Sequence, residues 1–133
     1  MGFGAVLRKR SVLLAGATLA ATLTLAGTAV AAPAATGYAR CPAARMCVFS
    51  GLNGSGLIGA FTVGDGNLAD SSGPAGLNNT IESVWNRRAT SFWCLYSNAG
   101  YGGSSSSTYT AAAGHNLPVA ERNVTTSLRD CLA

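Results

Sequence analysis

The chain has few of the side chains that enzymatic catalysis requires. It contains one histidine, His115, among 133 residues, and only five acidic residues. His115 lies between a glycine and an asparagine in a segment with loop composition. Nucleophilic catalysis needs a nucleophile with a base beside it, and the cysteines are expected to be paired with each other. The acids form no motif for acid–base chemistry, so we predict a protein that is not an enzyme and has no cofactor. These acids are Asp65, Asp70, Glu82, Glu121 and Asp130.

Positive charge is also scarce once the N-terminus is set aside. Three of the nine basic residues lie in Arg8–Arg10, which leaves six arginines against five acids. A protein that binds nucleic acid or an anionic membrane usually carries a basic stripe or arm. The remainder of this chain has neither, so we expect no such partner.

The first 31 residues have the pattern of a secretory signal peptide. A basic patch at Arg8–Arg10 precedes an uncharged apolar run, and Ala29–Ala31 supplies the small residues that a signal peptidase requires. A transmembrane helix is the alternative, because the run exceeds the roughly 20 residues that span a bilayer. Its Ala, Thr and Gly content and the lack of a basic flank on its far side favour export with cleavage after Ala31. The expected organisation is a signal peptide at 1–31, a flexible N-terminal leader at 32–40 and one secreted domain at 41–133.

Helical periodicity is absent from the rest of the sequence, and a repeat takes its place. Cys47–Gly56 returns 47 residues later as Cys94–Gly103, with cysteine, apolar residue, aromatic, serine and closing glycine in the same order. Asn78–Val84 is echoed in the same way by Arg122–Leu128. A solenoid needs about three or more units to bury a face. Two copies therefore predict paired halves of one closed domain.

Short β-prone runs separated by turn residues predict an all-β sandwich of about eight strands. Glycines at the turns permit the positive φ that tight reversals need. The expected strands include Met46–Phe49, Leu57–Val63, Ile81–Trp85, Phe92–Tyr96, Thr108–Thr110 and Val124–Leu128.

The cysteines Cys41, Cys47, Cys94 and Cys131 all follow the signal peptide. An even number of cysteines in an exported domain predicts two disulfides. Zinc is the alternative, but the spacings are not those of zinc sites. Of the three possible pairings, we favour Cys41 with Cys47 and Cys94 with Cys131, because each bond then stays within one repeat.

Two aromatics and a glycine in the second repeat, Tyr96, Tyr101 and Gly103, resemble the first half of a βγ-crystallin Greek key. The first repeat is degenerate, because Gly54 stands where the second aromatic belongs. The later echo resembles the family's other signature: two Asn or Asp, two variable residues, Ser or Thr, and Ser. The resemblance implies a βγ-crystallin-like sandwich of two Greek-key motifs.

Within that superfamily, the signal peptide, the Cys41–Phe49 opening and the two expected disulfides resemble secreted bacterial inhibitors of metallopeptidases. This resemblance implies a single domain that binds an extracellular peptidase and blocks it. We also expect a secreted monomer with no membrane contact after signal cleavage. Inhibition requires a rigid, exposed loop that fills the cleft, although each candidate loop is equally explained as an ordinary solvated connection. The main candidate loop consists of Asn98, Ala99, Gly100 and Tyr101. The other candidates are Asp70–Gly76 and Asn86–Ala89.

Calcium binding, with a structural or stress role, is the second function that the resemblance implies. Calcium takes about six to eight hard oxygens, which the crystallin signature draws from both repeats. Each copy departs from the signature once, since Glu82 and Arg122 replace expected ligands. The alternative is that these Asn and Ser residues only cap turns through local backbone bonds. The matching positions are Asn78, Asn79, Thr80 and Ser83 in the first copy, and Asn123, Val124, Thr126 and Ser127 in the second.

Overall fold

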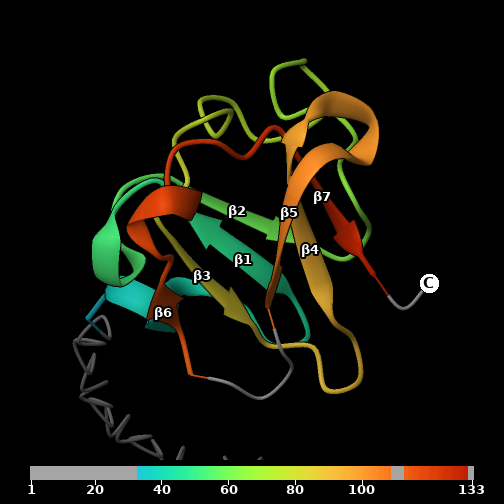
Figure 1. Ribbon diagram of the computed structural model, residues 1–133. Coiled ribbons are helices and arrows are strands. Elements are labelled where there is room, and N and C mark those ends of the chain that lie inside the picture. The colour runs from blue at the N-terminus through green and yellow to red at the C-terminus, as the bar shows by residue number, and fades with distance from the viewer. Residues whose placement is uncertain (1–32, 109–112, 132–133) are drawn as a thin grey trace, which may run out of the picture. The chain divides into compact units, whose positions relative to one another are not determined.

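The structure is a computed structural model that describes residues 33–108 and 113–131 (Figure 1). Two antiparallel sheets make up the fold, with strand orders β2-β1-β3-β6 and β5-β4-β7. The described residues contain no α-helix, and none of their helices is long and apolar enough to cross a membrane. The expected signal peptide at 1–31 lies outside the described residues. The strands are β1 (Met46–Phe49), β2 (Ile58–Phe61), β3 (Ser83–Asn86), β4 (Trp93–Asn98), β5 (Gly102–Thr108), β6 (His115–Asn116) and β7 (Ser127–Asp130).

Each half of the chain contributes one short segment to the other half's sheet. β6, from the second half, pairs with β3, placing His115 opposite Val84. Asp65, from the first half, forms a reciprocal bridge with Leu128 of β7 through backbone bonds of 2.8 and 2.9 Å. The two halves are therefore paired in one closed domain, as the repeat predicted, and the all-β Greek-key sandwich that the resemblance implied is confirmed. The described residues form seven strands and one isolated bridge, close to the expected number of about eight, but β6 and Asp65 were not among the predicted strands.

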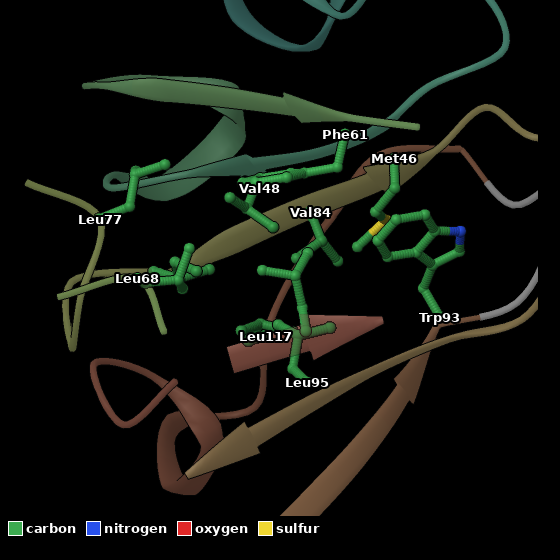
Figure 2. Close-up of a cluster of buried hydrophobic side chains, with 11 residues drawn as sticks. Met46, Val48, Phe61, Leu68, Leu77, Val84, Trp93, Leu95 and Leu117 are labelled. Atoms are coloured by element: carbon green, nitrogen blue, oxygen red, sulfur yellow. The ribbon is translucent and has the colours of Figure 1, made fainter. Parts of the chain in front are cut away.

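The main core lies between the two sheets (Figure 2). Alternate residues of a strand point to opposite faces, so Met46 and Val48 of β1 enter this core while Cys47 and Phe49 do not. Trp93 and Leu95 of β4 enter it from the second sheet, with exposed fractions of 0% and 2%. Burying an aliphatic or aromatic side chain contributes about 1.5–3 kcal/mol, so these positions fix the register of both sheets.

A second apolar cluster covers the other face of β1. Cys41, Cys47 and Phe49 are buried there, with Tyr38 and Trp85 packed against them. Tyr38 belongs to the 3-10 helix η1 (Gly37–Arg40). The prediction of a flexible leader is therefore wrong for Gly37–Arg40, because the apolar outer face of β1 has to be covered and this segment covers it.

Both predicted disulfides are confirmed. Cys41 is bonded to Cys47 and Cys94 to Cys131, with Cα–Cα distances of 5.8 and 5.6 Å, and no cysteine is free. Each bond stays within one repeat. Closing the shorter loop contributes on the order of 2 kcal/mol in the chain-entropy view, and closing the longer one nearer 4 kcal/mol.

Strand boundaries differ from the predictions where pairing partners decide them. The strand expected at Thr108–Thr110 begins earlier, at Gly102, and includes a run of serines, because Ser105 and Ser106 pair with Tyr96 and Leu95 of β4. Thr108 ends β5, and residues 109–110 of the expected strand lie outside the described residues. The last strand begins at Ser127 rather than Val124, whose side chain is 43% exposed.

Candidate contact loops and cation sites

Two buried serines, Ser83 and Ser127, make the same pair of hydrogen bonds at equivalent positions of the two repeats. The Ser83 hydroxyl donates to the carbonyl oxygen of Gly51 at 2.6 Å and accepts from the amide of Gly54 at 3.0 Å. The bonds tie the β1–β2 turn to β3. Because Ser83 is completely buried, losing its hydroxyl would leave backbone groups unsatisfied, at a cost of about 1–3 kcal/mol.

Ser127 makes the matching bonds in the second repeat, and these hold the main candidate loop, Asn98–Tyr101. Its hydroxyl donates to the carbonyl oxygen of Asn98 at 2.6 Å and accepts from the amide of Tyr101 at 3.1 Å. The amide of Gly100 donates to Gly66 at 2.8 Å. Ala99 and Gly100 are exposed at the tip. The loop is rigid, but the side chains it offers a partner are small.

The aromatic missing from the first repeat is supplied from outside the repeat. In the second repeat Tyr101 packs edge-on against Tyr96, with ring centroids 5.9 Å apart. Gly54 holds the equivalent place in the first repeat, and a Cβ there would lie 2.4 Å from the backbone nitrogen of Tyr38. The Tyr38 ring packs edge-on against Phe49 at 5.6 Å. Tyr38 thus packs edge-on against Phe49 as Tyr101 packs against Tyr96. The repeat signatures do not indicate this role of Tyr38.

The predicted calcium ligands meet in two pairs, each drawn from both repeats. The Thr126 hydroxyl donates to Asn79 Oδ1 at 3.1 Å, and Asn123 Nδ2 donates to Glu82 Oε1 at 3.2 Å. Asn79 and Asn123 both have left-handed backbone conformations, with φ of 53° and 59°. The fold therefore brings Asn79 beside Thr126, and Asn123 beside Glu82, across the two halves.

These pairs do not offer the donor set that calcium prefers. The Asn79–Thr126 pair has neutral oxygens only, and the other pair has a single carboxylate, whereas calcium takes about six to eight hard oxygens. Among the described residues no group of three or more His, Cys, Asp or Glu side chains could hold a metal ion. The geometry suits hydrogen-bonded ties between the halves, and calcium binding stays a prediction for titration.

Within the part of the chain that the structure describes, the remaining residues of the two calcium signatures have other partners or none, and they do not bond to these two pairs. Thr80 donates its hydroxyl to the carbonyl oxygen of Gly76 at 2.8 Å, which is a turn cap. Val124 can offer only its backbone carbonyl. Asn78 Oδ1 is buried and has no hydrogen-bond partner among the residues that the structure describes. Arg122 Nε donates to the carbonyl oxygen of Leu117 at 2.8 Å.

The candidate loop Asn86–Ala89 joins β3 to β4 and is braced from beneath. The buried Asn86 side chain donates to the carbonyl oxygen of Ser91 at 2.8 Å and accepts from the amide of Arg88 at 3.1 Å. One side chain therefore ties both ends of the loop, and the braced segment extends to Ser91, beyond the predicted end. Ala89 and Thr90 are exposed at its tip.

Two arginines fasten this β3–β4 loop to its surroundings. The Arg87 guanidinium lies 4.6 Å from the centroid of the Trp85 ring and donates to the carbonyl oxygen of Cys41 at 2.5 Å. The Arg88 guanidinium donates to the carbonyl oxygen of Thr62. The loop is thus held against the disulfide on one side and the end of β2 on the other.

The third candidate loop, Asp70–Gly76, is organised by its own first residue. The amide and hydroxyl of Ser72 both donate to the Asp70 carboxylate, and these bonds hold the pKa of Asp70 below its ordinary value. Hydrogen bonds to the charged form of a carboxyl favour that form. The loop has local order and is capped at Gly76 by Thr80, but no single side chain joins its two ends as Asn86 does in the β3–β4 loop.

Comparison with known proteins agrees with this architecture. A βγ-crystallin domain from Flavobacterium johnsoniae matches at 27% identity and a TM-score of 0.54, over 64% of this chain and 91% of that one. A βγ-crystallin from an archaeon matches at 21% identity and a TM-score of 0.51, over 67% and 99%. One from Ciona intestinalis matches at 13% identity and a TM-score of 0.53, over 65% and 98%.

No protein with a curated description matches the chain. The model of peptidase inhibitor family I36 matches residues 34–108, which include the disulfide-closed opening, the first repeat, the braced β3–β4 loop and the first two strands of the second repeat. With its βγ-crystallin fold, its two disulfides and this match over more than half of its length, the chain belongs to peptidase inhibitor family I36.

Proposed function

We propose that this protein is secreted and inhibits an extracellular metallopeptidase by inserting the β3–β4 loop, residues 86–91, into the active-site cleft. Membership of a peptidase inhibitor family supports the class of function. The observation that carries the choice of loop is the buried Asn86 side chain at its start, which bonds to Arg88 within the loop and to Ser91 at its end.

A loop that fills a peptidase cleft has to keep its shape while the peptidase acts on it. Ordering a flexible loop costs binding free energy, and a loop already held in its bound shape avoids that cost. Bracing by Asn86, the Arg87 bond to Cys41 and the Arg88 bond to Thr62 supply such preorganisation. The same ties would hold the ends together if the backbone were cut, which favours resealing over release.

The Asn98–Tyr101 loop is the second candidate for the contact. It is held by Ser127 and Gly66, but its one large side chain, Tyr101, is packed against Tyr96. A contact there would rest on backbone groups and on Ala99. The β3–β4 loop exposes Arg87 and Thr90 besides Ala89 and is tied by three side chains, and for that reason we place it first.

A matched pair of substitutions separates the two loops. Ala89 and Ala99 are both exposed, one at each tip, so Ala89→Glu and Ala99→Glu introduce the same side chain with little effect on folding. The protein without residues 1–31 is titrated against a thermolysin-type metallopeptidase and a panel of serine peptidases, with residual activity as the readout. We expect stoichiometric inhibition of the metallopeptidase, weakened about 100-fold by Ala89→Glu and little changed by Ala99→Glu.

Each other outcome has a distinct meaning. If Ala99→Glu alone abolishes inhibition, the contact belongs to the β4–β5 turn. If both variants inhibit as well as the wild type, neither loop enters the cleft. If the wild type inhibits no peptidase in the panel, the proposed function is wrong.

A further inference from the structure

A cationic hollow opens beside the braced loop. It measures about 330 Å³ and is lined by Thr62–Gly64, Arg88, Tyr101, Arg129 and Asp130, a set that we name the Arg129 hollow. Arg88 belongs both to this hollow and to the β3–β4 loop. Any partner that covers the loop from this side therefore also reaches the hollow.

Arg129 is held in place by stacking and not by an ion pair. Its guanidinium carbon lies 4.7 Å from the centroid of the Tyr101 ring and 5.7 Å from that of Tyr96, and Nε lies 3.4 Å from the Tyr96 hydroxyl. Within residues 33–108 and 113–131 these are the ring and hydrogen-bond contacts of its guanidinium group, and no carboxylate is among them. The terminal N–H groups of a fixed, exposed guanidinium remain available to an anion.

The residues that line the hollow include arginine, tyrosine and an exposed valine, which are of the types found at protein–protein interfaces. Val63, which is 75% exposed, lines both this hollow and a second one of about 290 Å³ whose lining also includes Gly73 and Pro74. Arginine and tyrosine are the residue types that most often dominate binding energy at interfaces. Two guanidinium groups share the hollow with one carboxylate, Asp130, so its net charge is positive.

We infer that the Arg129 hollow receives a carboxylate side chain from the surface of the inhibited peptidase, beside the cleft that the β3–β4 loop fills. This inference rests on the proposed inhibitory function and specifies that the inhibited peptidase carries an acidic side chain beside its cleft. A stacked guanidinium loses little side-chain entropy when it forms a bidentate bond with a carboxylate. The contact selects peptidases with an acidic rim at this position and disfavours those with a basic one.

The variant that tests the inference is Arg129→Gln, which keeps the first part of the aliphatic stem and a planar polar group and removes the charge. Its matched control is Val119→Glu, which changes the net charge by the same amount at a site that is 78% exposed and does not line the hollow. We expect Arg129→Gln to weaken inhibition about 10- to 100-fold and to reduce its dependence on salt. Val119→Glu should stay within about threefold of the wild type. Thermal melts confirm that both variants are folded.

A second measurement does not depend on any peptidase. N-acetylglutamate methylamide is titrated into isotopically labelled protein, with N-acetylglutamine methylamide as the neutral control, while the Arg129 Nε and Tyr101 ring signals are followed by NMR. We expect shifts with the acidic probe only, and their loss in Arg129→Gln.

The two arms distinguish failure of this inference from failure of the proposed function. If Arg129→Gln inhibits as well as the wild type, the inference is overturned while inhibition stands. Equal responses to the acidic and neutral probes also overturn it. If no peptidase is inhibited but the acidic probe alone shifts the Arg129 signals, the carboxylate site is supported and the proposed function falls.

Discussion

Removing the side chain of Tyr38 tests whether the segment before Cys41 completes the first half of the domain. The ring packs edge-on against Phe49 at 5.6 Å and against Trp85 at 6.4 Å, and its hydroxyl donates to Asn116 Oδ1 at 3.1 Å. Each aromatic pair contributes about 0.5–1.5 kcal/mol beyond the burial of area, and the hydrogen bond about 1 kcal/mol. Tyr38→Ala should therefore lower the free energy of unfolding by about 2–4 kcal/mol.

For a domain of this size such a loss corresponds to a fall in Tm of roughly 10–25 °C. The assay is thermal and denaturant unfolding of the protein without residues 1–31, followed by circular dichroism. Tyr38→Phe is the matched control: it keeps both ring contacts and loses only the hydroxyl bond, so it should cost about 1 kcal/mol. If Tyr38→Ala costs no more than Tyr38→Phe, the ring contacts do not stabilise the fold and the reasoning fails.

A substitution at Gly54 tests the same idea from the other side. The Tyr38 backbone fills the space that a side chain at position 54 would need, although Tyr101 shows that tyrosine tolerates a similar conformation, with φ of 63° against 72°. Gly54→Tyr should be strongly destabilising in the full domain and much less so in a chain that begins at Cys41. Equal destabilisation in both chains would refute the claim that Tyr38 and an aromatic at position 54 occupy the same place.

Three further predictions concern the loops and the cation sites. Asn86→Ala removes the brace beneath the β3–β4 loop; we expect a loss of about 1–3 kcal/mol in stability and slow cleavage within residues 87–90 by the target peptidase, detected by mass spectrometry. An uncleaved variant that inhibits as well as the wild type would contradict this. Ser72→Ala should raise the pKa of Asp70 toward its ordinary value in an NMR titration, since the Ser72 hydroxyl is its strongest donor. Because the pKa of Asp70 is lowered in the fold, its contribution to stability is present above the unfolded-state pKa and is lost as the pH falls through the folded-state pKa. Calcium and chelator should leave Tm unchanged, because the Asn79–Thr126 and Glu82–Asn123 pairs are satisfied by each other; a Tm that rises with calcium would instead support the calcium-binding alternative.

Much of the fold was predictable because it depends on local pattern. The repeated cysteine, aromatic, serine and glycine order marks the same strand and turn twice, and Ser83 and Ser127 make matching bonds as a result. The choice of disulfides followed from the same repeat. Asn79 and Asn123 were correctly placed at equivalent turns, because asparagine tolerates the left-handed conformation that both adopt.

The candidate site was only partly predictable. The segment from Asn86 was proposed as a loop from its polar composition, but nothing in the sequence shows that one amide reaches both Ser91 and Arg88. Nor does the sequence show that Arg129 stacks on Tyr101 and Tyr96, which precede it by 28 and 33 residues. Such contacts depend on which strands become neighbours in a sheet, and that is a property of the whole chain.

The sequence by itself determined that this protein is a duplicated β unit with one disulfide in each copy, because turn conformation and strand periodicity are set by neighbouring residues. Only the tertiary structure decided that Tyr38 completes the degenerate first copy and that β6 and Asp65 exchange between the sheets. An exposed apolar face and an unpaired strand edge each need a partner, and any segment of suitable shape can meet that need. The residues of such a segment do not show by themselves which face or strand edge the segment will cover.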